Sequence, residues 1–342
     1  MKQANGVSMK SGALKIAVCA MAAGALLTLW GCASSGHGPE GAGVDGAKVN
    51  ADGSTDQANG ANAGKALPSY LDAARRYNVN ASRLSRVFVG GAVVRVTFTD
   101  EEGKPHREQV EGTLQMLRPA KLALNIRKVG QSLFWLGSDE KRYWWFDLTG
   151  ERKYAVIGTH AGFDQELAKK IGLSIHPLEL IRAMGVVELP VVDGTLGGTQ
   201  WSSDGKLLGI AAELSNAEAQ GGSVTGFVRV WVDPVDALPR KIELFDAQRR
   251  VVIMAEHAEP ATLTMHNEAV GPMLATRMVV SHVPSGAVLD MSLADATDGH
   301  KRLSEKAFDF ELVRASLKPE TVYDLDEIRR RNTEHQPMGS RP

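Results

Sequence analysis

The stretch REQVEGTLQMLRPAKLALNIRK, residues 107–128, decides the fold class of this chain. Apolar and polar residues alternate on both sides of Pro119. Such alternation gives a β-strand one apolar face and one polar face. Pro119 ends the first strand because proline has no N–H group to donate to a strand ladder. The stretch therefore predicts two successive strands of a sheet that buries one of its faces.

Similar short segments, bounded by turns, extend in both directions from this pair. We expect further strands at 87–99, 132–137, 142–148, 153–157, 199–202, 206–213, 224–232, 241–245, 251–258, 275–281, 287–294 and 307–313. Helices are expected from Leu67 onward, at 164–171 and at 177–184, where Pro177 suits a first helical turn and Gly185 suits a helix end. This succession predicts an α+β fold, with an antiparallel sheet curled around helices.

The first 31 residues have the pattern of a cleaved export signal. Lys2, Lys10 and Lys15 provide positive charge before or at the start of an apolar run at 16–29. That run is shorter than the ~20 residues of a membrane span and matches the core of a signal peptide. Met1 and Met9 are alternative starts, because either one leaves a positive segment before the run. We expect residues 1–31 to be a signal peptide.

The residues after the apolar run resemble a lipobox, the cleavage and acylation site of bacterial lipoproteins. Leu29, Trp30 and Gly31 precede Cys32 in that pattern, although Trp30 is bulkier than the usual residue. By this resemblance Cys32 becomes the mature N-terminus and carries acyl chains such as palmitate, which anchor it stably when two or more are present. Ala33 differs from the aspartate associated with inner-membrane retention, which favours an outer-membrane lipoprotein facing the periplasm. An ordinary secretory signal and an uncleaved anchor are the alternatives.

Composition divides the rest of the chain into a linker, a body and a tail. Residues 32–66 consist mainly of Gly, Ala, Ser, Asn and Asp. They bury too little apolar surface to fold, so we predict that they form a flexible tether. Residues 67–317 are the predicted folded domain. Residues 318–342 are a charged tail that we expect to be disordered, with the arginine run 329–331 as an alternative contact segment.

The titratable residues do not follow the pattern of a catalytic or metal site. Cys19 and Cys32 are the two cysteines, so the predicted domain has none. The sequence contains neither an HExxH nor a GxSxG motif. The 39 basic and 40 acidic residues form no basic stripe that would indicate nucleic acid. We expect no enzyme activity, metal, cofactor or nucleic-acid partner, while an enzyme with an unrecognised site remains an open alternative.

The order of these elements resembles the lipoprotein-localisation (Lol) carrier and receptor superfamily of LolA-like and LolB-like proteins. The matching parts are the leading helix, the first hairpin and the stretches at 117–124, 134–139, 142–147, 176–181, 231–234 and 238–246. The resemblance implies an incomplete antiparallel β-barrel of about 11 to 12 strands, with two or three helices covering an apolar cavity for acyl chains. This chain is longer than a typical carrier, and its lipobox is a feature of the receptor. The family has no catalytic residues to transfer.

A cavity in such a sheet would be lined by apolar side chains from one strand face. The candidate lining residues are Leu114, Met116, Leu124, Ile126, Phe134, Leu136, Trp145 and Phe227. A shift of one residue exchanges the two faces of a strand, so the inward set stays open, as does the alternative that these side chains fill a core. Trp144 and Trp145 must point to opposite faces, one of them toward lipid, a partner protein or the helix at 164–171.

Two functions are compatible with these observations. The first is a membrane-anchored lipoprotein that binds a lipid or the acyl chain of another lipoprotein, in lipoprotein localisation or envelope lipid handling. The second is a structural or interaction lipoprotein of the envelope with a filled core. They differ in whether the interior can accept a ligand.

Overall fold

One β-sheet forms the body of the molecule in the computed structural model, which describes residues 66–99, 105–149, 152–164, 175–192, 195, 197–214 and 226–334. The strands are β1 (Arg86–Thr99), β2 (Pro105–Leu117), β3 (Lys121–Lys128), β4 (Gln131–Ser138), β5 (Arg142–Asp147), β6 (Tyr154–Thr159), β7 (Gly197–Trp201), β8 (Leu208–Glu213), β9 (Phe227–Val232), β10 (Pro239–Phe245), β11 (Val251–Thr262), β12 (Met273–His282), β13 (Ala287–Ser292) and β14 (Thr321–Asp324). The helices are α1 (Tyr70–Ala81), α3 (Pro177–Ala183), α4 (Phe310–Leu317) and α5 (Leu325–Glu334), with short 3-10 helices η1 (His160–Gly162) and η2 (Glu305–Phe308).

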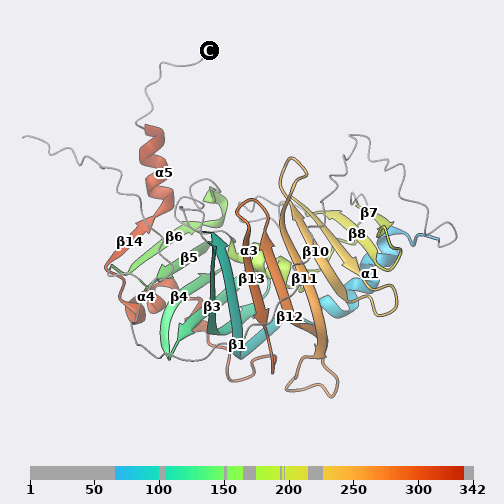
Figure 1. Ribbon diagram of the computed structural model, residues 1–342, viewed down its shortest axis with the longest axis horizontal. Coiled ribbons are helices and arrows are strands. Elements are labelled where there is room, and N and C mark those ends of the chain that lie inside the picture. Colours follow the sequence, from blue (N-terminus) through green and yellow to red (C-terminus); the bar gives the residue numbers. More distant parts are fainter. Residues whose placement is uncertain are drawn as a thin grey trace, which may run out of the picture.

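The 14 strands lie in the order β14-β6-β5-β4-β3-β2-β1-β13-β12-β11-β10-β9-β8-β7 (Figure 1). Strands that follow one another in the chain are antiparallel neighbours from β1 to β6 and from β7 to β13. β1 joins these two halves by pairing with β2 on one side and β13 on the other. β14 departs from the pattern because it pairs in parallel with β6.

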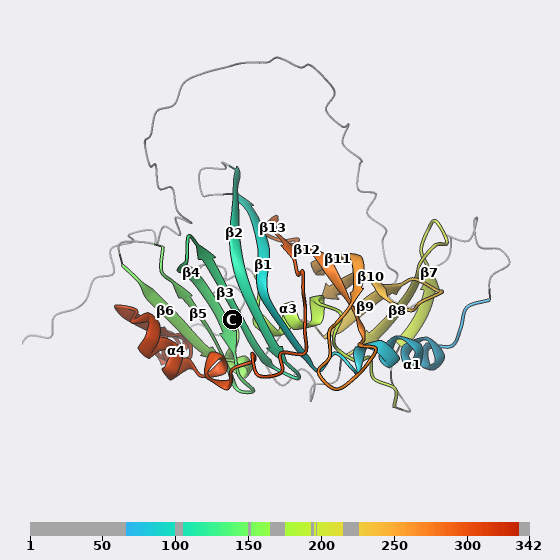
Figure 2. The ribbon, with the colours of Figure 1, turned by 90° about the horizontal axis from the view of Figure 1, so that it is seen from below.

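The sheet curves around α3, which makes contacts with both of its halves. α3 contacts β3 and β4 on one side and β10 and β11 on the other. Figure 2 shows strands rising on both sides of this helix, with α1 beside β7 and β8. α4 lies on the other, convex face, where Phe310 packs against Trp144 and Phe146 of β5. The apolar interior is thus the concave face of the sheet, and α1 and α3 are its cover.

Local sequence explains where the two covering helices begin. Ser69 caps α1 because its hydroxyl accepts a hydrogen bond from the backbone N–H of Asp72. Pro177 opens α3, where a missing N–H has no consequence. His176 caps α3, and the Glu179 side chain accepts a hydrogen bond from the His176 backbone N–H, which completes a capping box.

The fold class expected from the sequence is confirmed. The sheet is open and mostly antiparallel, and helices cover its concave face. It has 14 strands, more than the number that we expected. The strands expected on both sides of Pro119 are β2 and β3, and the helix expected at 177–184 is α3.

Two expectations about the C-terminal part are wrong. The strand expected at 307–313 is the end of η2 followed by α4, because Asp309 caps a helix whose apolar Phe310 and Val313 share one buried face. The charged tail expected to be disordered from residue 318 contains β14 and α5, because Leu325 is buried against Tyr143 and Trp145.

Other expectations fall outside the described part of the chain. The signal peptide, the lipobox with Cys32 and nearly all of the tether precede residue 66. The helix expected at 164–171 lies outside the described residues except for Asp164.

Candidate lipid-binding interior

A row of apolar side chains crosses the concave face over six strands. The row follows from strand register, which pairs Val89 with Leu114, Leu114 with Leu124, Leu124 with Leu136, Leu136 with Trp145 and Trp145 with Val156. Residues directly opposite one another on neighbouring strands share a face, so these side chains form one continuous apolar surface. Val89, Leu114 and Leu124 are at most 3% exposed.

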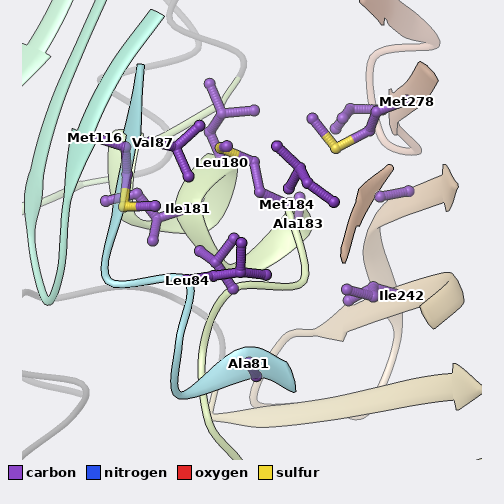
Figure 3. Close-up of a cluster of buried hydrophobic side chains, with 14 of the residues drawn as sticks. Ala81, Leu84, Val87, Met116, Leu180, Ile181, Ala183, Met184, Ile242 and Met278 are labelled. Atoms are coloured by element: carbon purple, nitrogen blue, oxygen red, sulfur yellow. The ribbon is translucent and has the colours of Figure 1, made fainter. Parts of the chain in front are cut away.

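The cover fills the hollow of the curved sheet. Figure 3 shows Leu180 and Ile181 of α3, with Met184 at its C-terminal cap, lying between Met116 on one side and Met278 on the other. Ile181 and Met184 are 1% and 2% exposed. One short helix therefore packs against both halves of the sheet at once.

The interior retains two small hollows, near the C-terminal end of α3. One is lined by Leu84, Met184, His257 and Leu274 among others, and has a volume of about 10 Å³. The second, of similar volume, is lined by Tyr77, Arg182, Val187, Leu214 and neighbours. A volume of this size holds roughly one water molecule. In this conformation, side chains therefore occupy the space that an acyl chain would need.

Two buried histidines hold the N-terminal end of α3. His160 Nε2 lies 2.8 Å from the carbonyl oxygen of Asp139, so it carries a hydrogen and donates it. The backbone N–H of Leu178 donates to His176 Nδ1, which therefore has no hydrogen. His176 Nε2–H must then donate to His160 Nδ1, 3.3 Å away. Every donor and acceptor in this histidine pair is matched only when both rings are neutral.

Burial favours that neutral state. His160 and His176 are 1% and 0% exposed, and Tyr143 packs beside both rings. Desolvation lowers the pKa of His160, and it lowers the pKa of His176 well below 6.5. The positive charges of His160 and Arg182 lower the pKa of His176 further. A proton added to either ring would break a hydrogen bond that holds α3.

Glu179 is the acidic residue of the same helix end. Its carboxylate accepts the N–H of His176 at 3.0 Å. Burial raises the pKa of Glu179 to about 7, although the hydrogen bond from His176 and the nearby Arg182 act in the opposite direction. The cover thus contains groups whose protonation changes have opposite effects on its stability.

The C-terminal end of α3 is held by β11 and α1. His257 of β11 lies with its Nε2 2.7 Å from the Ala183 carbonyl oxygen, and burial lowers its pKa to about 4. The Tyr77 hydroxyl of α1 donates to the carbonyl oxygens of Gly185 and Val187. Asn78 exchanges two hydrogen bonds with Leu189. α1, α3 and the segment between Met184 and Leu189 are therefore joined to one another, and we call them the helical cover.

The structure divides the residues proposed to line a cavity into three groups. Leu114, Met116 and Leu124 are buried in the main core, where the half-buried Ile126 and Leu136 pack against them. Phe134 and Trp145 lie in an adjoining cluster with Tyr143, Val156 and Leu325, which Leu136 also contacts. Phe227 differs from the expectation. Its neighbour Val228 enters the core, while Phe227 packs against Phe245 and beneath Arg249 on the opposite face.

Trp144 and Trp145 do point to opposite faces. Trp144 packs against Phe310 of α4 on the convex face, and Trp145 lies with Leu325 on the concave face. Both indoles are nearly or completely buried. The helix over the outward tryptophan is α4, in a segment that we expected to be a strand.

The polar groups that hold the cover were not identified from the sequence. A search for catalytic or metal motifs passes over His160, His176 and His257, because their nearest polar partners include backbone atoms distant in sequence. One signal was available. The sequence His-Pro-Leu-Glu at 176–179 fits the start of a helix with a capping residue, Pro at the first position and Glu at the third.

Within the ranges given above, no group of three or more His, Cys, Asp or Glu side chains has the arrangement of a metal site. None of the helices in those ranges has the length and apolar character that a membrane crossing requires.

No protein-family model and no curated protein matches this chain. Among solved structures, a DUF1329 family protein from Desulfovibrio piger is similar with a TM-score of 0.46 and 12% identity, over 71% of this chain and 96% of its own. A putative outer membrane lipoprotein-sorting protein domain from Vibrio parahaemolyticus has a TM-score of 0.43 and 10% identity, over 66% of this chain and 90% of its own. A LolA superfamily protein from Nitrosomonas europaea has a TM-score of 0.43 and 12% identity, over 72% of this chain and 99% of its own. A LolA superfamily protein and a lipoprotein-sorting domain are thus among the solved structures to which this chain is similar.

Proposed function

We propose that this protein is a lipoprotein of the cell envelope whose concave interior takes up an acyl chain when the helical cover shifts. The observation that carries the proposal is the position of α3. This helix of seven residues packs against β3 and β4 and also against β10 and β11. A shift of one short element would uncover apolar surface on both halves of the sheet.

The apolar surface beneath the cover suits an acyl chain. The row from Val89 through Leu124 to Val156 crosses six strands without a charged residue. Covering apolar surface with another apolar group is worth roughly 25 cal/mol per Å², so a lipid chain can replace the contacts that α3 gives up. Because the hollows near Met184 and Val187 hold about one water molecule each, uptake requires the cover to move first.

Membrane attachment is the second part of the proposal. Cys32, preceded by Leu29, Trp30 and Gly31, would carry the acyl anchor. The body would then face the periplasm from the outer membrane and bind lipid or the acyl chain of another lipoprotein. We propose no catalytic residue.

A fluorescent fatty acid tests uptake directly. The protein is titrated with the probe, and an unlabelled fatty acid is then added to displace it, while native mass spectrometry detects any lipid that copurifies. Leu136→Trp places bulk on the concave face, and Phe227→Trp places the same bulk on the convex face as the matched control. We expect saturable uptake that weakens at least about tenfold in Leu136→Trp and is unchanged in the control, because only the first variant narrows the interior.

The small size of the hollows favours a second candidate function. A protein whose interior stays filled would act in the envelope through its surface, as a structural or interaction lipoprotein. Absence of saturable uptake by a folded protein, at every lipid chain length tried, would contradict the first proposal and leave the second.

A further inference from the structure

Three exposed valines surround the first helix. Val79 on α1 is 69% exposed, Val235 in the turn between β9 and β10 is 87% exposed, and Val270 in the turn between β11 and β12 is 71% exposed. We call these three residues the valine surface. Single exposed aliphatic residues are common on protein surfaces. Such residues indicate a binding surface only where they lie near one another.

Two arginines connect the three positions. Arg76 of α1 donates hydrogen bonds to the carbonyl oxygens of Pro234 and Val235. Arg83, which follows the C-cap of α1, donates to the carbonyl oxygen of Val270 and pairs with Glu268. Along the chain, Val79 therefore lies between the two residues that contact the turns carrying the other valines.

The valine surface is at one end of the strands. Turns that alternate along an antiparallel meander lie at opposite ends, so the β9–β10 and β11–β12 turns share an end. α1 lies at that end, as Figure 2 shows. The described chain enters at this helix, since Ala66 precedes α1 directly and follows Cys32 by 34 residues. A linker of that length and composition spans roughly 30 Å, so an anchored molecule would keep this end close to the membrane.

The chemistry of the surface fits the boundary between lipid headgroups and acyl chains. Aliphatic side chains at the tips of turns can enter the apolar part of a bilayer without moving the rest of the fold. Arg75, whose side chain is 64% exposed and lies 3.9 Å from the Asp72 carboxylate, is four positions before Val79 and therefore on the same side of α1. A guanidinium group donates two parallel hydrogen bonds to a phosphate, which suits a phospholipid headgroup.

We propose that the valine surface docks on a phospholipid bilayer and thereby orients the folded body toward it. This inference rests on the proposed attachment through Cys32. The docking can be weak, because the tether already holds the body near the membrane and raises its effective concentration.

Site-specific labelling tests the docking in the full lipidated chain. Apart from Cys32, the chain after the signal peptide has no cysteine. A cysteine introduced at Val79, Val235 or Val270 can therefore be labelled with the environment-sensitive dye NBD. The labelled protein is reconstituted in vesicles of phosphatidylethanolamine with a minor share of phosphatidylglycerol. We expect the emission at all three positions to rise at least about twofold compared with the protein in detergent-free buffer without vesicles.

Two other exposed valines are matched controls. Val129, which is 94% exposed, lies in the β3–β4 turn, and Val283, which is 51% exposed, lies in the β12–β13 turn. Both turns are at the other end of the strands. Dyes at these positions should not respond to vesicles. An equal response at all five positions, or no response at the valine surface, would overturn the docking proposal.

The remaining outcomes separate the docking from the anchor. The NBD emission at the valine surface could also rise with protein concentration when no vesicles are present. That result would assign this surface to a second copy of the chain and overturn the proposal. Reaction of Cys32 with a maleimide in the protein without added cysteines would instead show that the anchor is absent. In that case the vesicle response of the labelled variants still decides whether the valine surface binds lipid.

Discussion

His176 Nε2 lies 3.3 Å from His160 Nδ1, in a buried contact that holds the N-terminal end of α3. Both rings must be neutral for the chain of hydrogen bonds from Leu178 to Asp139 to form. The helical cover is therefore tied to the sheet by groups that acid can protonate.

Acid should loosen the cover through His176. Its pKa is well below 6.5 in the folded protein, so at lower pH the unfolded chain binds more protons than the folded one. Stability from this residue is then complete above about pH 6.5 and decreases as the pH falls from there toward the folded pKa. Glu179 acts in the opposite direction over the same pH range, so the effect of His176 is measured as a difference. In urea unfolding from about pH 7 to pH 5, the stability of the wild-type protein should decrease relative to that of His176→Asn, which can still cap α3.

An exposed histidine provides the control for that measurement. His266 is exposed and stacks on His300, outside the contact between His160 and His176. His266→Asn makes the same exchange of side chains, and its pH slope is the reference for that of His176→Asn. If His176→Asn also has the wild-type slope, the buried pair does not account for the sensitivity to acid.

Glu179 should produce the opposite dependence. Burial raises its pKa to about 7 in the folded protein, from an ordinary value of 4.5. Between these values the folded chain binds more protons, so the contribution of Glu179 to stability is complete below about pH 4.5 and decreases as the pH rises through about 7. Glu179→Gln keeps an oxygen that accepts the His176 N–H and does not titrate. In urea unfolding, the free energy of unfolding of the variant minus that of the wild-type protein should increase from pH 5 to about pH 8. A difference that does not change with pH would contradict this assignment.

The C-terminal segment should depend on Leu325. This residue is 4% exposed and connects β14 and α5 to the cluster of Tyr143 and Trp145. Leu325→Ala removes buried aliphatic contacts worth about 2 to 5 kcal/mol at such a site. We expect proteolysis within β14 and α5 at concentrations of protease that spare the wild-type protein. Tyr323→Ala, at a position that is 38% exposed, should change the cleavage little, and equal resistance of Leu325→Ala would contradict the packing role.

Gly137 should tolerate no side chain. It faces Trp144 across the β4–β5 pair, and an added Cβ would overlap the buried indole ring. Gly137→Ala should lower the free energy of unfolding by about 1 to 3 kcal/mol, the usual cost of overpacking, in a denaturant titration. Gly198 in β7 has no neighbouring atom within 4 Å of such a Cβ, so Gly198→Ala is the control. Equal effects of the two substitutions would show that the contact with Trp144 is not limiting.

The strands were predictable where burial is one-sided. In β2, Val110, Leu114 and Met116 are buried in the main core, while Glu111, Thr113 and Gln115 between them are more exposed, so the alternation is visible in the sequence. The same alternation misled the choice of Phe227, because β9 carries apolar residues on both faces and Val228 is the one that enters the core. Which face points inward depends on register with β8 and β10, and local sequence does not contain that information.

The C-terminal elements were hidden for a different reason. Phe308, Phe310 and Leu312 alternate with polar residues as they would in a strand, although Asp309 caps a helix in which Phe310 and Val313 are three positions apart. β14 forms because it pairs in parallel with the edge strand β6, which is far away in the sequence. The histidine contacts of the cover are likewise long-range, since His257 meets Ala183 across the interior.

The central position of β1 has a consequence for the order in which the sheet can assemble. Val93 of β1 pairs with Glu111 of the adjacent hairpin, but also with Ser292 of β13 near the other end of the domain. The first half of the sheet can therefore assemble early, while the far side of β1 keeps its hydrogen-bonding groups unpaired until almost the whole chain is present. Such late, long-range pairing is slow, and an open strand edge can pair with other molecules. The contact between β1 and β13 is thus the part of the sheet at which a folding chain is most exposed to aggregation.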